Sequence, residues 1–215
     1  NVIKYVKEQA EFSEEIKEDV DLLLFPETAV NGYKYKYSNE TVLVDLAKER
    51  ESTFLVGYKD WLSSMGGPAN AVHFYDKNGK LIDKYFKNKL VPIFENLPMH
   101  NKLQTLVNQP ITGNFLQNNL NFIYNKLKYP TFMPFDTEYA VQTDVGNLGV
   151  RICYEGTFPD LFRTEVKEGA DVLIILSSNV LFGENSMMPH IDFNTNLVRA
   201  VENGRYLVRN DNFGV

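Results

Sequence analysis

The spacing of apolar residues alternates along the chain between two patterns. Short continuous apolar runs, such as LLLF at 22–25, are typical of strands buried on both faces. Between them lie segments whose apolar residues recur every three or four positions, as on one face of a helix. The predicted strands are 22–25, 53–58, 171–178 and 205–211, and the predicted helices are 1–20, 41–50, 160–169 and 191–204. Strands that alternate with helices predict an α/β protein with a mixed sheet.

Two further stretches predict hairpins, because alternating apolar runs flank a turn dipeptide. In the first, AVHFY and KLIDKYFK flank Asn78-Gly79, and an Asn-Gly pair between apolar runs is the strongest short hairpin signal. The second stretch, at 139–155, is expected to turn at Gly146-Asn147. Each hairpin adds an antiparallel pair to the predicted mixed sheet.

Composition and charge act mainly by exclusion. The 215 residues carry a formal charge of −6, with one cysteine and three histidines. A single cysteine rules out an internal disulfide and a cysteine-rich zinc site, and three dispersed histidines offer little for another metal centre. The acidic balance argues against a protein that binds nucleic acid by neutralising phosphates. We therefore expect one globular domain over residues 1–215, with no metal and no cofactor.

The chain also shows no sign of a membrane span or a signal peptide. No apolar run approaches the roughly 18 residues that cross a bilayer, and the opening stretch 1–21 is charged. Both ends break off within a regular element, so the domain is expected to be cropped at both ends. Residues 99–130 lack clear periodicity and are interpreted either as a lid packed on the domain or as an amphipathic arm on a membrane surface.

Three reactive side chains stand where predicted strands end. Glu27 follows LLLFP, a position where α/β sheets build their sites and where burial raises a carboxyl pKa toward that of a base. Lys87 and Lys89, in KYFKNK, are expected to share one strand face, and Cys153 ends the strand in VRICYEG. Each also has a plainer interpretation: Glu27 as a helix cap, the lysines as protection of an edge strand, and Cys153 as a core residue.

Together, these residues resemble the nitrilase, or carbon–nitrogen hydrolase, superfamily with its Glu-Lys-Cys triad. FPETA at 25–29 is similar to the glutamate motif of that family, and YFKNKLVP at 85–92 is similar to its lysine motif. GNLGVRICYEGTFPDLFR at 146–163 is similar to the cysteine motif. The resemblance implies a nitrilase-like α-β-β-α sandwich with mixed sheets. It also implies that Glu27, Lys87 and Cys153 are the catalytic residues, with Lys89 where many members carry histidine.

Within the superfamily the chain most resembles the apolipoprotein N-acyltransferase branch. There the lysine motif continues as LVP, then a glutamate and a proline, seen here as residues 90–92, Glu95 and Pro98. RAVENGRYLVRNDNFGV, which closes the chain, is similar to the end of the branch pattern. One departure is Val180, which stands where that branch usually carries aspartate.

The resemblance implies an acyltransferase that works through a thioester. Glu27 would take the thiol proton of Cys153, and the thiolate would attack an ester carbonyl. Lys87 and the backbone N–H that follows the cysteine would stabilise the oxyanion. The acyl chain would then pass from a membrane phospholipid, as donor, to the N-terminal amine of a lipoprotein, as acceptor.

Three further residues are expected to support the site. Glu95 is expected to orient Lys87 or to shuttle protons. Glu155 is expected to support the site from beside the nucleophile, the alternative being a structural salt bridge with a residue such as Arg163. Tyr154 either lines the acyl pocket or simply packs.

The implied location is the outer, periplasmic face of the cell membrane, which the domain reaches through membrane helices of a parent protein. An alternative function is a soluble cytoplasmic amidase or nitrilase that hydrolyses a small carbon–nitrogen substrate. A third is a catalytically silent domain that binds lipid or a partner, against which the intact triad argues. None of these interpretations involves nucleic acid.

Overall fold

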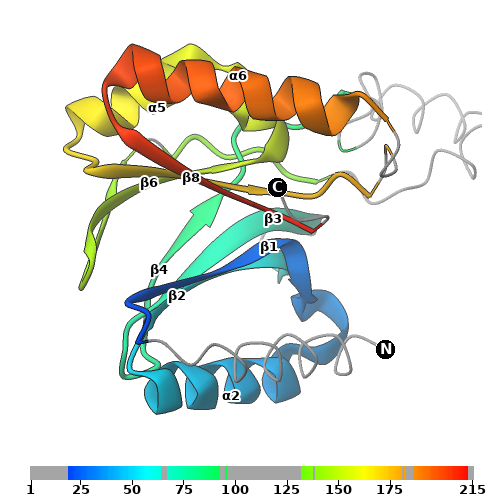
Figure 1. Ribbon diagram of the computed structural model, residues 1–215. Coiled ribbons are helices and arrows are strands. Elements are labelled where there is room, and N and C mark those ends of the chain that lie inside the picture. The colour runs from blue at the N-terminus through cyan, green and yellow to red at the C-terminus, as the bar shows by residue number, and fades with distance from the viewer. Residues whose placement is uncertain are drawn as a thin grey trace, which may run out of the picture.

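The chain folds into four layers, with two β-sheets face to face and helices on both outer sides (Figure 1). This computed structural model describes residues 19–63, 67–92, 95, 132–137, 139–180, 182 and 186–212. The excursion expected at 99–130 and nearly all of the helix expected at 1–20 lie outside the described residues. The α-β-β-α sandwich with mixed sheets is confirmed.

The first sheet has the order β1-β2-β3-β4. Its strands are β1 Leu22–Asn31, β2 Thr53–Leu62, β3 Gly67–Tyr75 and β4 Leu81–Phe86. β1 and β2 are parallel and the other pairs are antiparallel, so the sheet is mixed. Helix α2, Gly32–Arg50, connects the parallel pair and packs apolar side chains, among them Leu43 and Leu46, on the outer face of the sheet.

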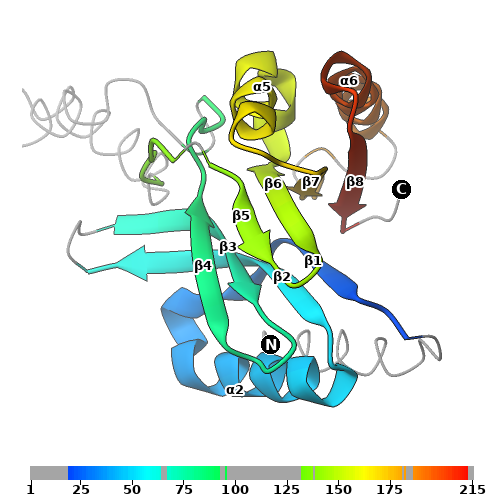
Figure 2. The same cartoon turned by 90° about the vertical axis from the view of Figure 1, so that its left-hand side faces the viewer.

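The second sheet has the order β5-β6-β7-β8. Its strands are β5 Val141–Thr143, β6 Gly146–Ile152, β7 Val172–Ser177 and β8 Tyr206–Asp211. β6, β7 and β8 run parallel, so their carboxyl ends meet at one edge. The 3₁₀ turn η1, Cys153–Thr157, follows β6, and the helices α5, Pro159–Lys167, and α6, Met188–Asn203, lie side by side on the outer side of this sheet (Figure 2).

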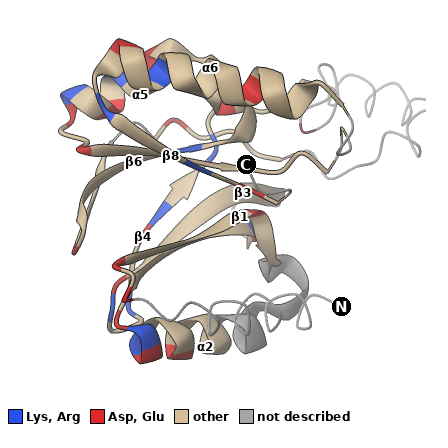
Figure 3. Cartoon of the chain, in the orientation of Figure 1, with Lys and Arg blue, Asp and Glu red and all other residues tan. Residues whose placement is uncertain are grey.

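Apolar side chains fill the space between the two sheets, among them Leu55, Phe74, Val150 and Ile174. Burying an apolar side chain of this size stabilises the folded state by about 1.5–3 kcal/mol, so this layer holds the sheets together. Charged residues lie mainly on the helices and near the ends of strands (Figure 3). None of the described helices combines the length and the apolarity that crossing a membrane requires.

Three boundaries differ from the sequence-based predictions. β1 continues past Pro26 to Asn31, although its regular pairing with β2 is interrupted between Phe25 and Val30. The helix predicted to start at residue 41 starts at Gly32, ahead of the first residues with clear apolar spacing. β4 ends at Phe86, so the prediction that Lys87 and Lys89 share one strand face is wrong. Lys87 is buried and Lys89 is exposed.

One predicted hairpin is confirmed and the other is shifted. Gly79, with φ +73°, lies in the turn between β3 and β4, as the Asn-Gly pair predicts. The second turn falls at Asp144-Val145 rather than at Gly146-Asn147, because Thr143 pairs with Gly146 across the strands. The Thr143 hydroxyl stabilises this turn by accepting from the Val145 N–H and donating to the Gly146 carbonyl.

Candidate active site

Glu27 lies in an irregular segment of β1 rather than after the strand. Pairing with β2 breaks on either side of it, and the next residue, Thr28, has φ +55°, a conformation that a β-branched residue rarely adopts. Across the gap lies Gly57 of β2, where an added Cβ would stand 2.2 Å from the Pro26 carbonyl oxygen. Glycine therefore lets the Glu27 segment approach β2, and the carboxylate is held in a buried position.

Gly57→Ala is expected to lower the free energy of unfolding by about 1–3 kcal/mol, because the new methyl group must push the Pro26–Glu27 backbone away. Turnover should fall as well, since Glu27 moves with that backbone. Gly149→Ala is the control. Gly149 lies in β6 of the other sheet, and its added Cβ would also be crowded, 2.8 Å from Glu165 Oε2 on α5, but away from Glu27. Thermal unfolding and turnover, measured together, separate displacement of Glu27 from a general loss of stability. Equal turnover in the two variants at equal stability contradicts the prediction.

Lys87 links Glu27 to a second carboxylate. Its side chain is fully buried, and its Nζ lies 3.1 Å from Glu27 Oε1 and 2.9 Å from Glu95 Oε1. Burial alone lowers the pKa of Lys87, but the charges of Glu27 and Glu95 outweigh it and raise that pKa above its ordinary value. The ammonium therefore stays protonated between its two partners, and the three groups together carry a formal charge of −1.

Asn70 of β3 holds the same two carboxylates from a further side. Its Nδ2 donates to Glu27 Oε1 at 2.6 Å and to Glu95 Oε1 at 3.2 Å. Its backbone carbonyl accepts the Lys87 backbone N–H. The Val91 N–H donates to the other oxygen of Glu95, at 2.8 Å. Asn70 was not predicted from the sequence, where its only signal was an amide within a mostly apolar strand, a place where asparagine is disfavoured.

Cys153 lies at the carboxyl end of β6, where the chain enters η1 with φ +51° at this residue. A non-glycine residue in this region costs about 1–3 kcal/mol and marks a functional position when the surrounding fold enforces it. Burial raises the pKa of the thiol well above its ordinary value, and Glu27 raises it further, whereas Lys87 lowers it. The thiol is therefore neutral at rest, and it needs a base before it can react.

Burial also raises the pKa of Glu27, partly offset by the charge of Lys87. A carboxylate with a raised pKa is a stronger base than one in water, and this one interacts electrostatically with both the thiol and the ammonium. The structure thus brings the three residues predicted to be catalytic into one electrostatically coupled group. The plainer interpretations, a helix cap and an edge-strand lysine, do not fit the buried contact between Glu27 and Lys87.

Glu155 ties the segment that carries Lys87 to the segment that carries Cys153. Its carboxylate accepts the Tyr85 hydroxyl, at 2.7 and 2.8 Å, and the backbone N–H groups of Asn88, Lys89 and Ile152, at 2.7 to 3.0 Å. The alternative salt bridge with Arg163 is not formed, because Arg163 is largely exposed and lies nearest Asp160, at 3.5 Å. Glu155 therefore acts through the backbone on both sides of the site.

Tyr154 packs edge-on against Phe158, with ring centroids 5.1 Å apart. This contact fits the packing alternative, and it lies within the turn that carries Cys153. Within the described part of the chain, no group of three or more His, Cys, Asp or Glu residues is arranged to hold a metal ion.

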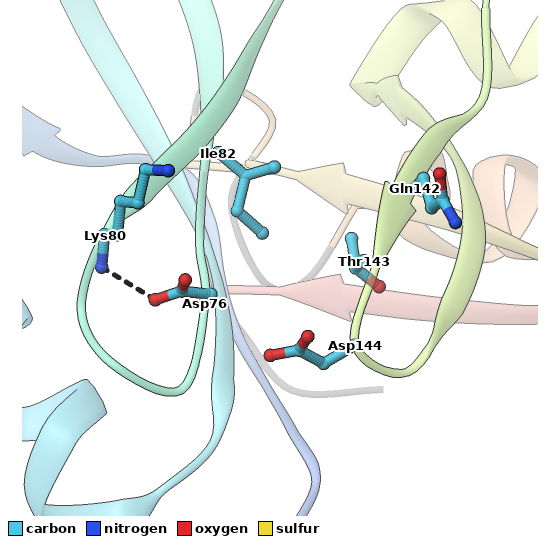
Figure 4. A pocket seen from close by; sticks show the side chains of 6 residues that line it. All are labelled: Asp76, Lys80, Ile82, Gln142, Thr143 and Asp144. Carbon is cyan, nitrogen blue, oxygen red and sulfur yellow. Dashed lines mark hydrogen bonds between the residues drawn. The ribbon is translucent and has the colours of Figure 1, made fainter.

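A separate surface pocket lies between the β3–β4 hairpin and the β5–β6 turn, lined by Asp76, Lys80 and Asp144 among others (Figure 4). β4 and β6 both start near this pocket and run away from it to Lys87 and Cys153. The pocket is thus at the opposite ends of these strands from the catalytic candidates, and it does not belong to the same site.

Comparison with known proteins gives one family and one recurrent enzyme. The sequence profile of the carbon–nitrogen hydrolase family matches residues 2–215. Apolipoprotein N-acyltransferase of Synechocystis sp. is 30% identical over 159 residues, which cover 72% of this chain and 27% of that protein. The enzyme of the same name from Geobacter metallireducens is 29% identical over 202 residues, covering 91% and 35%. The chain thus spans about a third or less of these two relatives.

Solved structures share the fold at lower sequence identity. A carbon–nitrogen hydrolase from Helicobacter pylori G27 superposes with a TM-score of 0.72 at 16% identity, covering 98% of this chain and 69% of that one. A mutant of an amidase from Nesterenkonia sp. AN1, with acrylamide added at its active-site cysteine, gives a TM-score of 0.62 at 18% identity, covering 98% of this chain and 70% of that one. At these identities the likeness concerns the fold.

Proposed function

Because the chain belongs to the carbon–nitrogen hydrolase family, we propose that its Glu27, Lys87 and Cys153 form the catalytic triad of an N-acyltransferase. The single observation that carries the proposal is the buried contact of Lys87 with Glu27, coupled electrostatically to the strained, neutral Cys153. The curated relatives named apolipoprotein N-acyltransferase favour transfer over hydrolysis.

The first half-reaction loads the acyl chain onto the enzyme. Glu27 takes the proton from the Cys153 thiol, and the thiolate attacks the ester carbonyl of a phospholipid. Lys87 and the backbone N–H of Tyr154 stabilise the oxyanion, and preorganised donors of this kind are worth about 10²–10³ in rate each. When the C–O bond breaks, Glu27 returns the proton to the departing alkoxide, and a thioester remains on Cys153.

The second half-reaction delivers the chain to an amine. The N-terminal amine of a lipoprotein attacks the thioester carbonyl, the C–N bond forms and the C–S bond breaks. Glu27 carries the proton released by the amine to the thiolate of Cys153, which restores the resting site. We place this reaction at a membrane, on its outer face, where a phospholipid donor and a lipoprotein acceptor meet.

The test is intact-mass analysis of the full-length protein, in detergent, after incubation with phospholipid. A long-chain acyl mass located on the peptide that contains Cys153, and lost on adding an amine-bearing lipopeptide, is the expected result. Release of ammonia from small amides, with no acyl mass on the protein, would instead establish the amidase alternative. The solved amidase of the same fold makes that comparison worthwhile.

Acyl loading should depend on pH through Glu27. Burial raises the pKa of this carboxyl above its ordinary 4.5, and only the ionised form can take the thiol proton. The single-turnover loading rate is therefore expected to fall about tenfold per pH unit below that raised pKa. Lys87, whose pKa is also raised, gives no loss on the alkaline side below about pH 10. In Glu27→Gln the residual rate should not show this acid limb. A wild-type rate that stays constant down to pH 4 argues against Glu27 as the base.

A further inference from the structure

A second charged cluster lies at the edge of the sheet where Cys153 lies. β6, β7 and β8 are parallel and in register, with Ile152, Leu176 and Asn210 in one row. Cys153 follows the first of these strands and Asp211 ends the third, so both lie just beyond that row. Active sites of α/β sheets form at such carboxyl ends, which makes the groups around Asp211 candidates for a part in the reaction.

The cluster consists of Asp192 on α6 and Arg209 and Asp211 on β8. Arg209 Nη2 lies 2.8 Å from Asp192 Oδ2 and 2.7 Å from Asp211 Oδ2, and Asn179 Nδ2 also donates to Asp211 Oδ2. The Arg209 side chain is 4% exposed, and its Nε and Nη1 have no partner within the described chain. Arg209 thus forms ion pairs with two carboxylates, and the three charged groups together have a formal charge of −1.

Helix α6 turns Asp192 toward the catalytic turn rather than toward solvent. One helical turn later, Asn196 is buried so close to η1 that a Cβ on Gly156 would stand 2.3 Å from Asn196 Oδ1. Asp192 and Asn196 share a face because residues four apart on a helix are neighbours. The opposite face is apolar and exposed, with Leu197 50% and Val201 83% exposed.

Asp192 is also coupled electrostatically to the reacting groups. Burial raises the pKa of Asp192, Arg209 lowers it, Asp211 raises it, and the more distant Lys87 lowers it. The Asp192 carboxylate in turn raises the pKa of Cys153. The described charged groups that act on Asp192 are therefore Arg209, Asp211 and Lys87, and the net result is a carboxylate more basic than one in water.

We propose that Asp192, positioned by Arg209, binds the cationic amine of the acyl acceptor beside Cys153 and takes its first proton. The inference rests on the proposed function, because it concerns the second half-reaction. Two clusters of formal charge −1, one around Lys87 and one around Arg209, attract an ammonium group and disfavour an anion. The Asp192 side chain keeps 13% of its surface exposed, which leaves a route for the proton to solvent.

The proton balance gives this carboxylate a task that Glu27 does not cover. An N-terminal amine has a pKa near 8, so at pH 7 it arrives mostly as an ammonium with three protons. One proton passes to Asp192 and on to water, which frees the nitrogen lone pair. The neutral amine then attacks the thioester, and the second proton moves through Glu27 to the thiolate of Cys153. The amide keeps the third.

The experiment uses the full-length protein in detergent and follows the two half-reactions separately. Acyl loading from phospholipid is measured by intact mass, and delivery to a lipopeptide with a free N-terminal amine is measured by loss of that mass between pH 6 and 9.5. The variants are Asp192→Asn, Asp192→Glu and, as a matched control, Glu202→Gln. Glu202 is another carboxylate on α6 that pairs with an arginine, Arg199, at 2.9 Å, and it is 42% exposed.

Asp192→Asn is expected to load acyl chain but to deliver it about tenfold or more slowly at pH 7, with the deficit shrinking above pH 8 as the free amine becomes neutral. Asp192→Glu should recover part of the rate, and Glu202→Gln should match the wild type. Equal delivery by Asp192→Asn and wild type at pH 7 overturns the inference and leaves the proposed function standing. Loss of loading in Asp192→Asn also overturns it, and absence of loading in the wild type overturns the proposed function itself.

Discussion

Cys153→Ala is expected to abolish acyl loading and to reduce turnover by about 10⁴-fold or more, with little change in stability. Cys153 is the single cysteine of the sequence, so its removal leaves no thiol to form the thioester. The substitution removes only the sulfur atom of a partly buried side chain at the margin of the apolar layer between the sheets, so little packing is lost. The thermal midpoint should therefore stay within a few degrees of the wild type.

Cys153→Ser sharpens this expectation. A serine hydroxyl is a much weaker acid than a thiol, so the Glu27 carboxylate that ionises Cys153 is too weak a base to ionise a serine in its place. We expect Cys153→Ser to fold normally and to remain inactive as well. Measurable turnover in Cys153→Ala, with a folded protein and no acyl mass, would mean that the reaction does not pass through this residue.

Much of the fold could be predicted because its signals are local. The Asn78-Gly79 turn needs only two residues, and an unbroken apolar run predicts the buried strand at 172–177. The position of Glu27 could not be predicted in the same way. Its irregular segment depends on Gly57, a residue thirty positions away whose missing side chain makes room for the Pro26 carbonyl.

In the candidate site, too, the residues with local sequence signals could be predicted and those brought in by distant elements could not. Glu27, Lys87 and Cys153 could be named from sequence because their motifs are contiguous, whereas their support comes from distant strands. Asn70 is part of the site only because β3 lies between β2 and β4, and Asp192 only because α6 packs on η1. A single sequence carries no signal for contacts of this kind, since each residue alone is compatible with an ordinary polar position.

Lys87→Met should be both the most destabilising substitution in the site and one of the most damaging to turnover. Lys87 neutralises two carboxylates, and leaving Glu27 and Glu95 without a cation costs about 3–5 kcal/mol. Loss of an oxyanion donor lowers turnover by about 10²–10³-fold. The pKa of Glu27 would then rise further, because the charge that offsets its burial is gone, and a protonated Glu27 cannot act as the base.

The pH dependence of stability distinguishes this account from simple loss of packing. In Lys87→Met the folded-state pKa of Glu27, already raised by burial, rises further above the unfolded value, so the folded form binds more protons. Its stability is then best below the unfolded pKa near 4.3 and is lost as the pH rises through the higher folded value. The deficit against the wild type should therefore shrink as the pH is lowered toward 5, when thermal midpoints are compared.

Lys89→Met is the matched control for the same chemical change two residues away. The Lys89 side chain is exposed, and only its backbone N–H, which the substitution keeps, contacts Glu155. We expect a change in stability within about 0.5 kcal/mol and near-normal turnover. If Lys89→Met abolished turnover while Lys87→Met spared it, the oxyanion role would belong to the exposed lysine. The buried Lys87 would then be a structural ion-pair partner of Glu27 and Glu95.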